Sequence, residues 1–137
     1  MAVWIDGFIV NIHDPTNCDI DFGDETNQLL RKRGLIANPY TYLDLNTGEN
    51  KESVSFRCRI NGVGKKKKTK ASGKITSLIN SLINRSDGWV KCRIVSIDTY
   101  SRILTDIFIM LPDGNINLAE YLMENDKNTY FPYVRRF

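Results

Sequence analysis

The segment from residue 89 to residue 125 constrains the fold most, because its pattern predicts one local arrangement. Two strand-like runs, residues 90–97 and residues 103–111, lie on either side of a short polar connection that begins at Asp98. Apolar, β-branched runs of this length joined by a short connection are typical of a β-hairpin. A Pro-Asp-Gly turn begins at Pro112, and an apolar pattern of helical period follows it. The segment therefore predicts a hairpin followed by a helix.

Two helices with clear patterns are predicted, and a short third one is considered around residues 25–32, where the periodicity is weak. Residues 71–85 carry apolar side chains at i, i+3, i+4, i+7 and i+8, which is the stripe of an amphipathic helix packed on a core. The helix after Pro112 starts with a capping box, because Glu120 stands three residues after Asn117. Asn125 stands where a helix often ends in a left-handed backbone, a conformation that asparagine accepts next best after glycine.

A strand with one cationic face is predicted at residues 53–61. Apolar and polar residues alternate there with a period of two, so Arg57 and Arg59 project to the same side. Planar guanidinium groups match the geometry of phosphate oxygens through paired hydrogen bonds. This strand therefore predicts a face that contacts an anion.

The connection between the two strands reads Asp-x-Tyr-x-Arg-x-Leu from Asp98 to Leu104, and it resembles the core signature of staphylococcal-nuclease-like domains. Ser101 stands where that family usually has glycine. The Arg-x-Arg-Ile-Asn-Gly-Val motif at residues 57–63 strengthens the resemblance, which covers roughly residues 54–125 and more loosely the first 22. It implies an α+β fold, a five-stranded OB-type β-barrel with two or three packing helices. The length fits a single domain, residues 1–137, with an insertion at about 23–52.

The resemblance also implies where a nuclease site would lie. Arg59 and Arg102 match the family's two arginines at the scissile phosphate, whereas its acidic positions hold Asn17, Gly64 and Lys67. Calcium needs oxygen ligands, and water is activated by a base with a free lone pair, so glycine and a protonated lysine serve neither purpose. We therefore expect no catalytic residues, no cofactor and no calcium-stimulated cleavage. The alternative is an active calcium-dependent phosphodiesterase, with carboxylates drawn from Asp14, Asp19 and Asp21.

The charge distribution favours an anionic partner for the second part of the chain. The formal net charge is +3, but residues 1–52 hold nine acids and four bases, whereas residues 53–137 hold seven acids and fifteen bases. A lysine-rich loop stands where the family's substrate loop would be, and it predicts phosphate contacts through Lys65, Lys66, Lys67, Lys68 and Lys70. Tyr130 and Tyr133 in the tail either stack on a base or dock into the domain's own core.

Three functions remain open from the sequence. The leading one is a catalytically inactive nuclease-like domain that binds DNA or RNA through backbone phosphates without sequence preference. The alternatives are the active phosphodiesterase and a structural or protein-interaction module with residues 23–52 as its interface. The chain has no apolar run of about 20 residues and no signal-peptide layout, so we expect an intracellular protein that does not contact membranes.

Composition adds two expectations. The cysteines are an odd count without a Cys-x-x-Cys spacing, and they are expected to be buried and reduced: Cys18, Cys58 and Cys92. The richness in Asn, Ile and Lys is typical of AT-rich genomes, viral ones among them.

Overall fold

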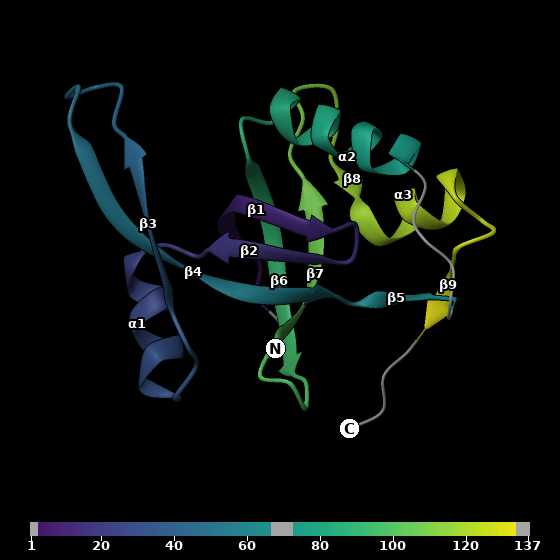
Figure 1. Cartoon of the computed structure of the whole chain (residues 1–137), viewed down its shortest axis with the longest axis horizontal. Helices are drawn as coiled ribbons and strands as arrows, with labels where there is room; N and C mark the ends of the chain where they lie inside the picture. The colour runs from purple at the N-terminus through teal and green to yellow at the C-terminus, as the bar shows by residue number, and fades with distance from the viewer. Residues whose placement is uncertain (1–2, 67–72, 134–137) are drawn as a thin grey trace.

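Five strands close into a β-barrel in the computed structural model of the chain, which describes residues 3–66 and 73–133 (Figure 1). The barrel strands are β1 (Ile5–Asp14), β2 (Asn17–Asp21), β4 (Asn50–Ile60), β6 (Trp89–Ile97) and β7 (Ile103–Ile109). Their order is β4-β2-β1-β6-β7, and a parallel pairing of β7 with β4 closes the ring. The other four pairings are antiparallel. The expected α+β barrel is confirmed.

Within the described residues, three helices and four further strands surround the barrel. The two expected helices are α2 (Gly73–Arg85) and α3 (Leu118–Asn125), and they lie together near one end of the barrel (Figure 1). The remaining elements are α1 (Asp24–Lys32), β3 (Asn38–Leu43), β5 (Gly62–Lys65), β8 (Ile116–Asn117) and β9 (Tyr130–Tyr133). Among the described residues, no helix has the length and apolarity that crossing a membrane requires.

The core lies inside the barrel, because each strand turns every second side chain inward. The inward side chains that solvent does not reach include Ile20, Phe56, Cys58, Ile60, Val90, Cys92, Ile107 and Ile109. All three cysteines are buried and free, which confirms their expected role as small core residues. Burial raises the pKa of each thiol, so the three remain protonated at neutral pH.

The segment expected to be an insertion, residues 23–52, forms α1 and a projecting arm (Figure 1). The arm is the antiparallel hairpin of β3 and the outer half of β4, residues 50–55. The sequence predicts an extended segment at Tyr40, Tyr42 and Leu43 that packs on the barrel. The segment is extended as β3, but five of the six residues of β3 are exposed. β4 supplies the backbone hydrogen bonds along one edge of β3, and water can satisfy the other edge. The strand therefore does not need to pack on the barrel to form.

Asp21 anchors the arm to the barrel. Its carboxylate accepts hydrogen bonds from the Tyr40 and Ser53 hydroxyls, each at 2.6 Å, from the Asn27 amide at 2.8 Å and from the Gly23 backbone at 2.9 Å. Burial raises the pKa of Asp21, but these four donors outweigh it and hold the pKa below its usual range. One side chain thus joins β2, α1, β3 and β4.

The hairpin between β6 and β7 turns through a strained residue. Ser101 has a φ of 61°, a left-handed conformation that costs other residues more than glycine, which explains the family's preference. At α3, the Asn117 side chain accepts from the Glu120 backbone at 3.2 Å, as expected. The prediction for Asn125 was wrong: it does not adopt the left-handed conformation, and its amide instead donates to the Tyr121 carbonyl at 2.9 Å.

Candidate functional site

Arg59 and Arg102 lie at one end of the barrel beside Asn17, as the motif match predicts. Asn17 is the cross-strand partner of Arg59, and its side-chain oxygen accepts from Arg102 Nη1 at 2.9 Å. Arg59 Nη1 donates to the Thr16 hydroxyl at 2.6 Å. The fold therefore brings together three of the residues that the family uses around its phosphate.

Acidic side chains balance the charge of Arg102 and of the neighbouring Arg57. Arg102 Nε lies 2.7 Å from Asp98 Oδ2, and Arg57 Nε lies 3.1 Å from Asp19 Oδ1. Burial raises the pKa of Asp98, but backbone N–H groups and the Arg102 guanidinium outweigh this effect, and its pKa is lowered. A guanidinium already paired with a carboxylate attracts an added phosphate less strongly than an unpaired one. The arginines are therefore placed as in a phosphate site, but their paired charges make the site less attractive to a phosphate.

The carboxylates proposed as alternative metal ligands are engaged separately. Asp14 accepts from the Thr16 backbone and hydroxyl, both at 2.8 Å, and from Asn17 at 2.9 Å. Asp19 Oδ2 lies within hydrogen-bond distance of His13 Nε2, at 2.7 Å, and Asp19 Oδ1 accepts from Arg57 Nε. Asp21 accepts the hydrogen bonds that anchor the arm. Within residues 3–66 and 73–133, no three His, Cys, Asp or Glu side chains converge as a metal site would require. The carboxylates serve the fold, and we do not propose a calcium site from them.

Gly64 lies under an aromatic ring. It pairs with Phe131 in the two-stranded β5–β9 sheet, and a Cβ built on Gly64 would approach the Phe131 ring to 2.7 Å. The Phe131 ring therefore leaves no room for a side chain at Gly64, the position where the nuclease family has a carboxylate. Lys67, Lys68 and Lys70 fall outside the described residues. Lys65 ends β5, and the Lys66 backbone donates to the Thr129 carbonyl at 2.9 Å.

The two tail tyrosines have different positions. Tyr130 is 3% exposed, so the stacking role considered for it is wrong and the alternative, docking into the domain's own core, is the one observed. Burial, with Asp14 and Asp126 nearby, raises the pKa of Tyr130 to about 12. Tyr133 is 45% exposed and contacts Phe131 edge-on, with 6.2 Å between ring centroids. Only Tyr133 of this pair remains accessible to a ligand.

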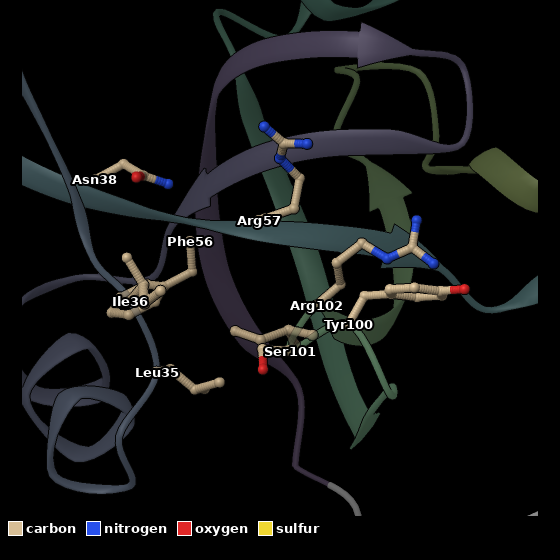
Figure 2. A pocket seen from close by; sticks show the side chains of 9 residues that line it. Leu35, Ile36, Asn38, Phe56, Arg57, Tyr100, Ser101 and Arg102 are labelled. Atoms are coloured by element: carbon tan, nitrogen blue, oxygen red, sulfur yellow. The ribbon is translucent and has the colours of Figure 1, made fainter.

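A pocket of about 470 Å³ lies beside the arginines, between the residues that precede β3 and the β6–β7 turn (Figure 2). These two segments reach β4 at Ser55 and Cys58, on either side of Phe56 and Arg57. The lining residues are Leu35, Ile36, Asn38, Phe56, Arg57, Tyr100, Ser101, Arg102 and Ile103. The tertiary fold alone assembles this pocket from three distant parts of the chain.

The pocket wall is mainly apolar. The Arg57 guanidinium points away from the other lining side chains (Figure 2), toward its partner Asp19. The Arg102 guanidinium lies at the edge of the pocket and donates to Asn17. Arg102 also lies over the exposed Tyr100 ring, 5.3 Å from its centroid. Sequence reasoning missed Leu35, Ile36 and Asn38, because residues 23–52 have no regular apolar period. Tyr100 lay inside the recognised motif and was the one available signal.

The fold is similar to that of extended Tudor domains. The extended Tudor domain TD3 of mouse TDRD1, solved with a MILI peptide containing dimethylarginine 45, is 9% identical with a TM-score of 0.57, covering 96% of this chain and 94% of that chain. The domain from BmPAPI, in complex with sDMA, is 11% identical with a TM-score of 0.54, covering 90% and 97%. The Drosophila melanogaster Papi domain is 7% identical with a TM-score of 0.54, covering 96% and 100%.

These similarities establish a staphylococcal-nuclease-like barrel and nothing finer, since the identities are so low. No protein-family model matches the sequence, and no curated protein matches it. The barrel expected from the motifs is thus confirmed, and the three similar structures named above are extended Tudor domains. A nuclease ancestry with a degenerate site is not supported by them.

Proposed function

We propose that this chain is a protein-interaction domain that binds an extended segment of a partner protein. An apolar side chain of that segment occupies the pocket between the start of β3 and the β6–β7 turn, which we call the Tyr100 pocket. The observation that carries the proposal is the pocket itself: it is open and mainly apolar, and the two arginines beside it are already paired with Asp19 and Asp98. Apolar concave sites with a few polar groups are typical of ligand binding. Asn38 and Ser101 supply the polar groups.

The similar domains support a peptide as the ligand, but the pocket favours a different side chain. Two of those domains were solved with ligands that contain methylated arginine or sDMA. A methylated guanidinium keeps its positive charge. The charged residues that line this pocket are both arginines, Arg57 and Arg102, and no carboxylate lines it. We therefore expect an aliphatic or aromatic side chain to bind in preference to a methylarginine.

Peptide selection from a random library against the purified chain tests this proposal. Selected peptides should share one large apolar residue, and replacing Ile36, which is 77% exposed, by Glu should weaken their binding at least about tenfold. The matched control is Leu45→Glu at the tip of the arm, where the residue is 89% exposed and outside the pocket. Failure to select peptides, or equal binding by both variants, would contradict the proposal. Methylarginine peptides that bind better than apolar ones would contradict the choice of side chain.

Nucleic acid is the second candidate, and the excess of bases from residue 53 onward is the observation that favours it. If the lysine-rich loop binds phosphates, affinity for an oligonucleotide should fall steeply with salt. Replacing Lys65 and Lys66 by Ala should then lower the slope of log affinity against log salt by about 0.9 for each lost contact with duplex DNA. Since the arginines are already paired, we expect no measurable binding at physiological salt. Tight binding of an oligonucleotide at physiological salt would reverse the order of the two candidates.

A further inference from the structure

An aromatic face covers the outside of the barrel on β1, β6 and β7. Because Gly7, Val90 and Ile107 point into the core, the residues that alternate with them point outward. We use the name outer aromatic face for the surface formed by these outward residues: Trp4, Asp6, Phe8, Trp89, Lys91, Arg93, Asp106 and Phe108. The strand register places Phe8 opposite Trp89, Asp6 opposite Lys91, Lys91 opposite Phe108 and Arg93 opposite Asp106. The face is therefore continuous across three paired strands.

Its aromatic rings contact each other and remain accessible. Trp4 and Phe108 meet edge-on with 5.1 Å between centroids, and Phe8 and Trp89 do so at 5.7 Å. Trp4 is 41% exposed and Trp89 is 52% exposed, so no described segment of the chain covers them. Exposed aromatic clusters of this kind mark interaction surfaces, because tryptophan buries a large area at low cost in conformational entropy.

The charges on this face are paired within it. Lys91 Nζ lies 2.8 Å from Asp6, and Arg93 lies 2.6 Å from Asp106 while its guanidinium covers the Trp4 ring at 5.1 Å. Two cations and two anions leave no net charge on the face. A polyanion or a strongly charged peptide gains little here, whereas an identical neutral face meets no repulsion.

We propose that a second copy of this chain binds the outer aromatic face and forms a two-fold symmetric dimer. In this dimer the two faces lie against each other, and the two-fold axis runs between them, perpendicular to the strands. The first end of β6 in one copy then lies opposite the second end of β6 in the other copy. Trp89 at one end then meets Arg93 and Trp4 at the other end of the copy, which pairs an aromatic ring with a cation. This self-complementarity is what an isologous interface requires. The pocket beside Tyr100 has no part in it.

The two tryptophans of the chain report directly on this surface, because both lie on it. As protein concentration rises through the dimerisation range, light scattering should show the mass doubling. Over the same range, tryptophan emission should shift to shorter wavelength and acrylamide quenching should decrease, since burial removes the rings from water. A monomer at all accessible concentrations overturns the proposal. A dimer with unchanged tryptophan quenching places the interface elsewhere and also overturns it.

Variants separate this face from the pocket. Trp89→Ala should weaken dimerisation at least about tenfold, because a tryptophan that becomes buried on association is typical of an interface hot spot. Tyr100→Ala, which removes another exposed ring, should leave the dimerisation constant unchanged. Equal dimerisation by the wild-type chain and the Trp89 variant would contradict the proposal. A selected peptide that binds the pocket should leave the tryptophan emission of the dimer unchanged, so the two proposals fail independently.

Discussion

Replacing Asp21 by Ala should lower the free energy of unfolding by about 2 to 4 kcal/mol, because the change removes the acceptor of four hydrogen bonds to an ionised group. The hydroxyls of Tyr40 and Ser53 and the amide of Asn27 lose their shared partner. Urea denaturation measures the loss. Hydrogen exchange should show it first in the arm, where the amides of β3 should exchange faster than those of the barrel core.

The effect should depend on pH in a defined direction. The pKa of Asp21 is lowered in the folded chain, so its stabilising effect is fully present above the unfolded pKa of about 4. It is lost as the pH falls through the lower folded pKa. The difference in stability between wild type and variant should therefore narrow progressively below about pH 4. Asp113→Ala is the control, since that exposed carboxylate lies 3.5 Å from Arg85 in a solvent-screened pair and should change little. A constant difference across this pH range would contradict the assigned role of Asp21.

Restoring an acidic residue at Gly64 should destabilise the chain without creating a nuclease. Gly64→Asp places a Cβ within 2.7 Å of the Phe131 ring and puts a carboxylate in a buried position. Overpacking and the burial of a charged group together should cost about 2 to 4 kcal/mol. The same Cβ would also lie 3.2 Å from the Cβ of Tyr133. Urea denaturation measures the cost, and a calcium-stimulated cleavage assay should show no activity.

A double-mutant cycle identifies Phe131 as the cause. Gly64→Ala should already be destabilising, and adding Phe131→Ala should recover part of the loss relative to the sum of the single changes. Gly73→Ala is the matched control, since a Cβ at Gly73 meets no atom within 4 Å. If Gly64→Ala and Gly73→Ala behave alike, the ring does not close this position. The absence of a carboxylate there would then need another explanation.

Local patterns predicted most of the elements. The apolar stripe of residues 71–85 gave α2 to within two residues, and the capping pair at Asn117 marked the start of α3. The motif from Asp98 to Leu104 predicted the β6–β7 hairpin and, through the family resemblance, the barrel. These succeed because helix periods, caps and turns depend on residues close in sequence. An extended segment was expected at residues 40–43, but its projection away from the barrel was not, because β3 pairs with the outer half of β4 and follows no core pattern.

The amino-acid sequence by itself determined the barrel, the two predicted helices and the positions of Arg59 and Arg102. Only the tertiary structure decided what those arginines contact. Asp98 lies four residues from Arg102, but Asn17 is 85 residues away, and Asp19 is 38 residues from Arg57. The same holds for the pocket and the outer aromatic face, whose residues come from separate strands and loops. Charge pairing and exposure depend on distances in space, and residue types along a chain do not specify those distances until the strands have paired.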